Sequence, residues 1–297
     1  MKALSINNKF ICNLPENWNE LTADQLLKVC SLVFTSHDPN TLLVQLLLLF
    51  SGLKFSTRRD PVMVDVIPHY YLKHNKTKIA LISVEDVAFA ASPLQFIFTL
   101  HNDNPVIESK LFHNKLPEIK CGRKKLFGPD SALFNISFAE FIKLESLYDQ
   151  YGKKNDPLTL DAIIAVLYRE QDPDNSPQSP KFSGDIRVPF NDHLVEANEK
   201  VIKGLKPEYK LAIRLFYEGC RWFIFKGSKL FPNAFSGDCS DDSGMPAIHE
   251  FTKLVNALSN DDATRMEQIR QTRAWDIFYQ LEALAQRNKE LKKKSHV

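Results

Sequence analysis

Three segments of this chain begin with a helix-capping pattern, and apolar residues at helical spacing follow each one. The paired positions are Thr22 with Gln25, Ser83 with Asp86, and Ser137 with Glu140. In this pattern the first hydroxyl accepts an exposed amide of the first helical turn, and the fourth side chain can reach back to the cap amide. Apolar residues then recur every three or four positions, as on one face of a helix. These features predict a mainly α fold.

The rest of the pattern predicts further helices, short strands and polar connections. Apolar runs predict helices at residues 40–50, 158–168, 191–205, 207–225, 246–258 and 262–294. Short Val- and Ile-rich runs predict strands near residues 62–67, 78–82 and 116–120. We therefore expect two related helical modules with minor β inserts and a long C-terminal helix. The expected domains are a first module with a β-containing insert at residues 1–130, a second module at 131–235, and an acidic loop with a helical extension at 236–297.

Two parts of the sequence follow the same pattern. Residues 21–29 (LTADQLLKV) run parallel to residues 136–144 (ISFAEFIKL). An Asp-Pro pair follows each segment, at Asp38 and Asp156, and an apolar helix is expected after each pair. Proline suits the first turn of a helix, because its missing amide would have no partner there. Either the chain is internally duplicated or two capped helix pairs look alike; a duplication predicts two similar helix pairs.

The composition is that of an ordinary globular protein. The 297 residues are 44% hydrophobic and 25% charged, with a net charge of +2. This balance does not favour a nucleic-acid or membrane partner. The five cysteines are widely spaced, unlike a disulfide framework or a zinc ligand set. The most apolar run, residues 42–50, is too short to span a membrane, and residues 1–12 lack a signal-peptide pattern. We therefore expect a cytoplasmic protein.

No part of the sequence carries a catalytic or metal-binding motif that we recognise. His69 and His74 are five residues apart, which suits neither one helix face nor a zinc pair. The acidic loop at residues 237–244 lacks the alternating ligands of an EF-hand, and the glycine motifs that bind phosphates are absent. We expect no catalytic residues, no metal and no cofactor, and therefore no enzyme. An enzyme whose site is assembled from distant residues stays an alternative.

Two short basic clusters are candidates for phosphate contacts. One is formed by Arg123, Lys124 and Lys125, and the other by residues 292–294 near the C-terminus. In a nucleic-acid-binding protein such residues produce a strong dependence of binding on salt. Because the whole chain is nearly neutral, we expect solvated surfaces here, and a nucleic-acid partner is not favoured.

The C-terminal helix has the clearest interaction pattern. Six residues follow the alternating spacing of a coiled-coil seam: Ala274, Ile277, Leu281, Leu284, Asn288 and Leu291. Trp275 and Phe278 widen this stripe, so packing on the body of the protein is the second interpretation. The candidate partner-binding residues are Trp275, Phe278, Leu281 and Leu284. Replacing Phe278 and Leu281 with Asp separates the interpretations, because a surface stripe would lose its partner whereas a core stripe would unfold the protein.

Two segments resemble a known family. Residues 15–27 (PENWNELTADQLL) contain a Trp and a Leu-Thr-x-x-Gln phrase that leads into the first helix. They resemble the start of tail-assembly-chaperone-like proteins of bacteriophages and prophages, and residues 273–281 (RAWDIFYQL) resemble the closing helix of that family. The resemblance implies a helical factor that keeps the tape-measure protein soluble while the tail tube polymerises. This chain departs from the family in its length and its apparent duplication.

These observations lead to one functional hypothesis and two alternatives. The hypothesis is a non-catalytic protein-binding factor in phage tail assembly, which binds an amphipathic helix of a tape-measure or other tail protein in an apolar groove. The alternatives are a structural tail or neck component of the particle and a nucleic-acid-binding accessory protein. The expected location is the host cytoplasm, with the virion as an alternative. No membrane partner is expected, and homo-oligomerisation stays open.

Overall fold

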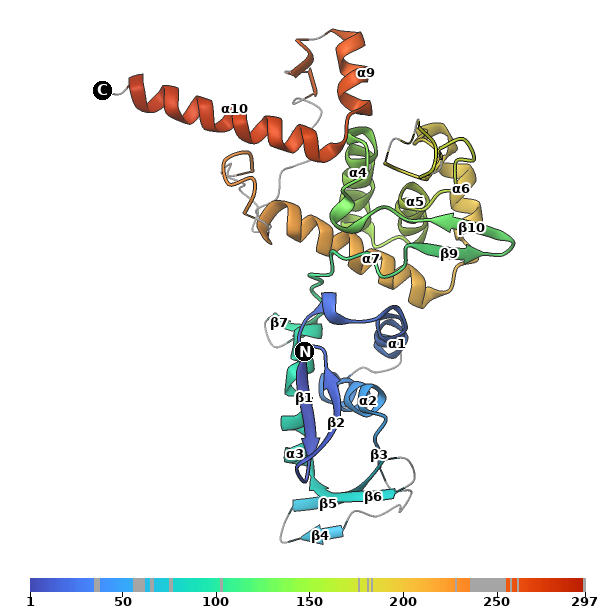
Figure 1. Cartoon of the computed structure of the whole chain (residues 1–297), viewed down its shortest axis with the longest axis vertical. Helices are drawn as coiled ribbons and strands as arrows, with labels where there is room; N and C mark the ends of the chain where they lie inside the picture. Colours follow the sequence, from blue (N-terminus) through green and yellow to red (C-terminus); the bar gives the residue numbers. More distant parts are fainter. Residues whose placement is uncertain are drawn as a thin grey trace. The chain divides into compact units, whose positions relative to one another are not determined.

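The chain forms two compact units in the computed structural model, Met1–Leu111 and Phe112–Val297. The described residues are 1–34, 38–55, 62–64, 67–74, 77–101, 104–175, 177–180, 182, 184–227, 229–235, 255–256, 258–260 and 262–295. They are mainly helical with small antiparallel sheets, which confirms the expected fold class (Figure 1). We call the two parts unit 1 and unit 2 and describe each by itself.

The boundary between the units differs from the expected one at residue 130. Phe112 stacks on Phe223 with 4.3 Å between ring centroids, so the segment before residue 130 already belongs to unit 2. The C-terminal helix also packs within unit 2 and is not a separate extension. Both departures arise from contacts between residues far apart in sequence, which a linear pattern does not show.

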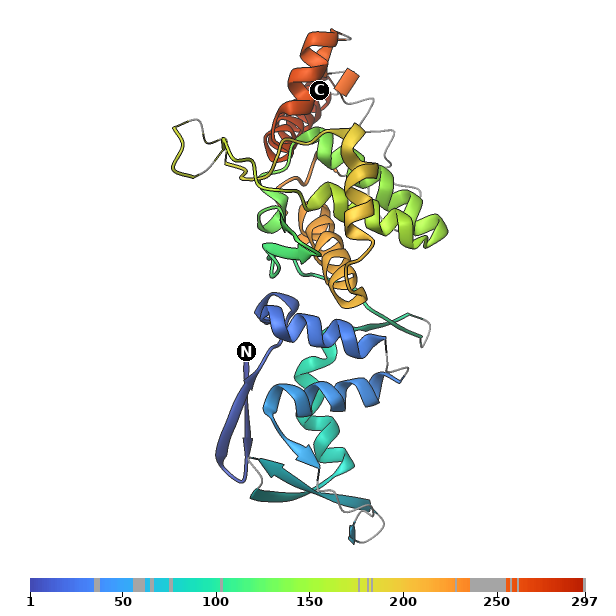
Figure 2. The same cartoon turned by 90° about the vertical axis from the view of Figure 1, so that its right-hand side faces the viewer.

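Unit 1 begins with an antiparallel hairpin that the sequence analysis did not predict. It consists of β1 (Lys2–Ile6) and β2 (Lys9–Leu14). The turn residues Asn7 and Asn8 have left-handed φ values of 51° and 59°, which asparagine tolerates better than most residues. The hairpin lies alongside two helices of the same unit, α2 (Pro39–Ser51) and α3 (Val84–Ala91) (Figure 2).

The other elements of unit 1 are short. The turn η1 (Trp18–Glu20) leads into α1 (Ala23–Val33), and α3 continues into η2 (Ser92–Ile97). Strand β5 (Ile67–His74) pairs with β3 (Lys54–Phe55), β4 (Val62–Val64) and β6 (Thr77–Ser83), and β7 (Thr99–His101) pairs with β8 (Asn104–Val106). The β-containing insert is therefore present, with a central strand at 67–74 that the sequence analysis missed.

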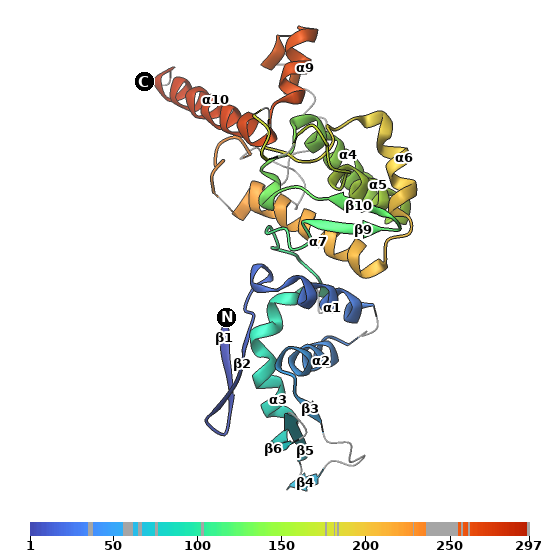
Figure 3. The same cartoon turned by 45° about the vertical axis from the view of Figure 1, so that its right-hand side comes forward.

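Unit 2 also begins with a hairpin, followed by a larger set of helices. The hairpin consists of β9 (Glu118–Cys121) and β10 (Lys124–Phe127). The elements after it are η3 (Ser131–Leu133), α4 (Phe138–Lys154), α5 (Pro157–Leu167), η4 (Asp192–Leu194), α6 (Val195–Ile202), α7 (Pro207–Trp222), the π-helical turn η5 (Phe223–Gly227), α9 (Ala263–Gln271) and α10 (Ala274–Ser295). Figure 3 shows α5 and α6 side by side, behind the hairpin.

The prediction of one helix over residues 262–294 is wrong, because the helix is interrupted at Thr272. Thr272 is extended, with φ −68° and ψ 149°, and its carbonyl accepts the amide of Phe138 at 2.8 Å. The amide of Ala274 donates to the carbonyl of Ile136 at 3.0 Å. This short strand-like pairing fastens the start of α10 to the start of α4. The helix expected at residues 246–258 lies mostly outside the described residues.

The two units start with the same succession of elements: a hairpin, a 3-10 turn, a capped helix and a second helix that begins with proline. Both first helices have complete capping boxes, at Thr22 and Ser137. Both second helices are capped by an aspartate that accepts the amide and the hydroxyl of a threonine, Asp38 with Thr41 and Asp156 with Thr159. These matching caps support the internal duplication and extend it to the preceding hairpins.

The core of unit 2 is an aromatic cluster between α4 and α10. Phe278 is fully buried, and its ring centroid lies 4.9 Å from that of Phe141 and 5.7 Å from that of Phe231. The indole nitrogen of Trp275 donates to the carbonyl of Ala132 at 2.9 Å. Because Trp275 and Phe278 are about one helical turn apart, they lie on a single face of α10, and this face packs beside α4.

We expect Phe278→Ala to lower the free energy of unfolding of unit 2 by about 3–5 kcal/mol, the usual range for truncating a buried phenylalanine. Urea denaturation followed by tryptophan fluorescence measures this. Leu284→Ala is the matched control, because Leu284 lies on the same helix and is 41% exposed. A control that destabilises the protein as much as Phe278→Ala would contradict this packing.

Candidate binding site

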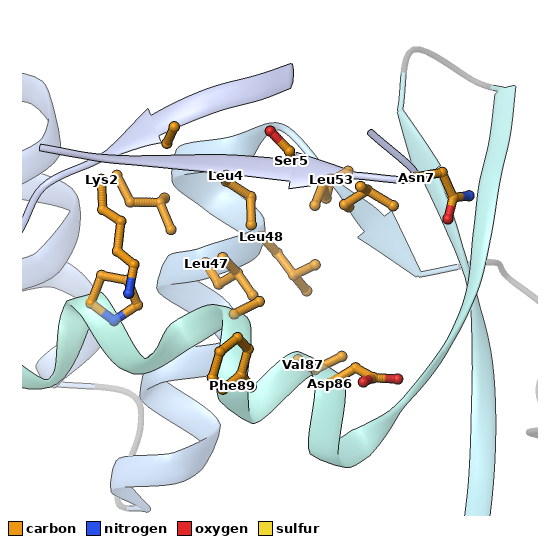
Figure 4. Close-up of a pocket in the computed structure, with 15 residues that line it drawn as sticks. Lys2, Leu4, Ser5, Asn7, Leu47, Leu48, Leu53, Asp86, Val87 and Phe89 are labelled. Atoms are coloured by element: carbon orange, nitrogen blue, oxygen red, sulfur yellow. The ribbon is translucent and has the colours of Figure 1, made fainter. Parts of the chain in front are cut away.

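Unit 1 contains an apolar pocket between β1, the C-terminal half of α2, and α3. Its volume is about 360 Å³, which lies in the size range of pockets that hold a small ligand or a few side chains. Leu4, Leu47, Leu53 and Val87 line it and are buried. Figure 4 shows the leucines of α2 and Leu4 of β1 pointing into the same space.

The local sequence explains how these side chains converge. Side chains alternate along a strand, so β1 directs Leu4 toward the helices. The register of the hairpin shifts between Leu4 and Ser5, which is a bulge in the pairing. On the other side, the capping box of Ser83 and Asp86 fixes the start of α3, with the Ser83 amide donating to the Asp86 carboxylate at 3.1 Å. Because the cap sets where α3 begins, it also sets the side of the helix on which Val87 faces the pocket.

Phe89 lies at the rim of the pocket and is 80% exposed. It occupies the outer side of α3, where a polar residue is usual. An exposed phenylalanine beside an apolar pocket is a feature of protein-binding surfaces, in which aromatic side chains are enriched. Phe89 was not among the residues predicted to bind a partner, although its position outside the apolar stripe of its helix was a visible signal. Leu4 and Val87 had no such signal, because their convergence depends on tertiary packing.

The polar groups at the pocket are few. Lys2 and Asp86 lie at its edge, and the Asp86 carboxylate also accepts the hydroxyl of Ser83 at 2.8 Å. The pocket therefore offers apolar contact and a rim with one charge of each sign. Such a site binds by shape and by removing apolar surface from water.

Unit 2 contains a buried charged cluster formed by Glu140, Arg169, Asp185 and Arg187. The side chain of Arg187 is fully buried, and its guanidinium lies 2.7 Å from the Asp185 carboxylate and 3.5 Å from that of Glu140. Arg169 pairs with Glu140 and donates to the carbonyl of Val188 at 2.7 Å. Burial opposes the charge of Arg187, but Glu140 and Asp185 outweigh it and raise its pKa. Since each charge in this cluster faces an opposite charge, we assign it a structural role.

A second buried network joins α4 to α7. The Glu145 carboxylate accepts the Tyr217 hydroxyl at 2.7 Å and two Arg221 nitrogens at 2.7 and 2.9 Å. The Arg221 guanidinium also lies over the ring of Tyr148, 4.3 Å from its centroid. Burial, followed by the nearby charge of Glu218, raises the pKa of Tyr148 to about 12. These contacts hold two helices together.

The structure corrects the predicted partner-binding surface on the C-terminal helix. Trp275, Phe278 and Leu281 are 3%, 0% and 7% exposed, so they belong to the core of unit 2, and their assignment to a partner surface is wrong. Of the four predicted residues, Leu284 is exposed. The stripe is therefore buried up to Leu281 and exposed from Leu284 onward, and only the exposed part stays a predicted partner surface.

The predicted basic cluster is largely paired. Lys124 and Lys125 lie 2.5 Å from the carboxylates of Glu170 and Glu118, and Arg123 occupies the exposed turn of the hairpin. The charge available to a phosphate is therefore smaller than the sequence indicates. The acidic loop at residues 237–244 lies outside the described residues.

Two features are absent from the part of the chain that the structure describes. In it, no three side chains of His, Cys, Asp or Glu gather closely enough to hold a metal ion. Within the same residues, no helix has the length and apolar character that crossing a membrane requires.

We expect Arg187→Met to lower the free energy of unfolding of unit 2 by about 3–5 kcal/mol, because the substitution removes one of the two buried guanidinium groups that face Glu140 and Asp185. The matched control is Lys124→Met, which removes an exposed ion pair and costs about 1 kcal/mol or less. Thermal and urea denaturation of both variants provide the comparison. Equal effects would mean that the cluster is hydrated and does not stabilise the fold.

Comparison with known proteins gives no assignment. No family model, no curated protein and no solved structure matches this chain.

Proposed function

We propose that this chain is a non-catalytic protein-binding factor that acts in phage tail assembly. The observation that carries the proposal is the apolar pocket of unit 1 with exposed Phe89 at its rim. Burying one such side chain in a complex contributes on the order of 1.5–3 kcal/mol. An amphipathic helix of the partner would supply apolar side chains three or four residues apart, a spacing that suits a pocket between a hairpin and two helices.

The phage context rests on the resemblance of residues 15–27 and 273–281 to tail-assembly-chaperone-like proteins. In the first segment, Trp18 is buried and its indole nitrogen donates to the carbonyl of Glu108 at 3.2 Å. The resembling residues thus include core positions that organise unit 1. The proposed partner is a helical tape-measure or other tail protein, met in the host cytoplasm.

A structural tail or neck component is the second candidate. The same pocket favours it, since an apolar surface of this kind also suits a permanent neighbour in a particle. Presence of the protein in purified particles at a fixed copy number would support a structural role. A chaperone-like factor is present during assembly and absent from the finished particle.

We expect Phe89→Asp to weaken binding of the partner by at least about tenfold, which corresponds to about 1.4 kcal/mol. The partner is a tail protein captured by the tagged chain from lysate of phage-producing cells, and titration of the purified pair measures the affinity.

Phe10→Asp is the matched control, because Phe10 is 61% exposed in the same unit and does not line the pocket. The control is expected to change the affinity less than about twofold. Capture of no tail protein, or equal loss in both variants, would overturn the proposal.

A further inference from the structure

The pocket of unit 1 runs along one edge of β1. Six consecutive residues, 2–7, line it from the first strand and its turn, whereas β2 contributes Leu14. A pocket over the face of the hairpin would be lined by alternate residues of both strands, because successive side chains point to opposite faces. Figure 4 shows β1 on one side of the pocket and α3 on the other. The pocket is therefore bounded by a strand edge and a helix.

The main-chain groups of Ala3 and Ser5 point to this edge. The turn after Ile6 has two residues with left-handed φ, the usual form of a tight hairpin, and Ile6 faces Lys9 across it. Such a pair exchanges hydrogen bonds, so the alternation along β1 directs the amides and carbonyls of Ala3 and Ser5 away from β2. Among the residues that the structure describes, the backbone hydrogen bonds of β1 are those with β2. The outer edge of β1 can therefore pair with another strand.

A molecule that fills the pocket has to satisfy these groups. Removing a backbone amide or carbonyl from water without a new partner is unfavourable. A helix uses its main-chain groups internally, so a helix alone would cover Ala3 and Ser5 without pairing with them. An extended segment beside β1 pairs with them, and every second one of its side chains can enter the apolar pocket. The pocket therefore suits an extended segment in addition to a helix.

The two ends of the pocket carry opposite charges. Figure 4 shows Lys2 near one end and Asp86 near the other. Asp86 already accepts the Ser83 hydroxyl and caps α3, whereas the exposed Lys2 can meet a carboxylate of an incoming segment. A matching segment has an acidic residue near Lys2 and apolar residues at alternate positions. The sequence of β1 itself, KALSI, contains no acidic residue, so the β1 strand of a second copy does not match.

We propose that the outer edge of β1 binds an extended segment of the partner, which adds as a strand between β1 and α3 and carries an acidic residue near Lys2. This segment lies beside the helix that contacts Phe89, so the inference rests on the proposed function and names a second part of the same partner. The lysine and the bulge between Leu4 and Ser5 are features that limit unspecific pairing of an exposed strand edge.

The test compares two substitutions of Ser5 in the full chain, each titrated with the purified tail protein that the wild type captures. Ser5→Pro removes the outward amide and keeps the pairing with β2, since an edge strand tolerates proline where the amide points away from its neighbour. We expect it to weaken binding about fivefold, the usual effect of losing one hydrogen bond. Ser5→Ala is the matched control, because it keeps the amide, and it should change the affinity less than about twofold. Equal affinities of the two variants would overturn the proposal.

The acidic residue of the partner is tested with Lys2→Glu, which is expected to weaken binding about two- to fivefold. Lys9→Glu is the matched control, because Lys9 is exposed on β2, does not line the pocket and gives the same change in net charge. Equal losses in both variants would overturn the charge match.

Amide hydrogen exchange of the wild-type complex tests the same contact without a proline variant. We expect the amides of Ala3 and Ser5 to exchange at least about tenfold more slowly in the complex, with the hairpin of β9 and β10 unchanged as a control. Protection of α3 without protection of β1 would overturn the proposal, because the partner would then bind through its helix alone. A wild-type dimer that Ser5→Pro dissociates in sedimentation would also overturn it, because a second copy would then occupy the edge.

These measurements separate the inference from the proposed function. Capture of no tail protein would remove both. Loss of binding in Phe89→Asp, together with unchanged binding in Ser5→Pro and no protection of β1, would leave the proposed function standing and remove the pairing with β1.

Discussion

The carboxylate of Glu140 is the contact on which the arrangement of unit 2 depends. It accepts the amide of Ser137 at 2.8 Å and so completes the cap of α4, and it also pairs with Arg169 and Arg187. One side chain thus joins the start of α4, the end of α5 and the segment that returns over both helices. A buried ion pair adds little net stability over an apolar packing of equal volume, but breaking it is costly. Its role here is therefore to fix one arrangement of three segments.

The first helix pair of unit 1 has matching caps without this charge. Gln25 completes the cap of α1 as a neutral side chain, with its oxygen 3.0 Å from the Thr22 amide. Leu49 of α2 is 38% exposed, whereas Leu167, at the matching position of α5, is buried. Two helix pairs with matching caps therefore differ in how they anchor neighbouring segments, because Glu140 pairs with Arg169 and Arg187, whereas Gln25 carries no charge. The proposed binding pocket lies in unit 1.

The sequence predicted the features that depend on neighbours along the chain. Capping boxes, Asp-Pro helix starts and the resulting repeat could be recognised because each involves residues within four positions of one another. The pocket could not be recognised, because Leu4 and Val87 meet only after the hairpin folds against α2 and α3. The apolar stripe on α10 was predicted, but the sequence does not show which half of it is buried, because that depends on where α4 packs against α10. The strand near 116–120 was predicted and overlaps β9, but its partner β10 and the hairpin of β1 and β2 were missed.

The bond from Trp275 to the carbonyl of Ala132 joins residues 143 positions apart. During synthesis the aromatic core of unit 2 therefore stays incomplete until the ribosome has added α10. Met1–Leu111 forms a compact unit of its own, and domains generally fold in the order of their synthesis. At about 5–20 residues per second the rest of the chain takes on the order of 10–40 s to add. The pocket of unit 1 can thus form while the rest of the protein is still being synthesised.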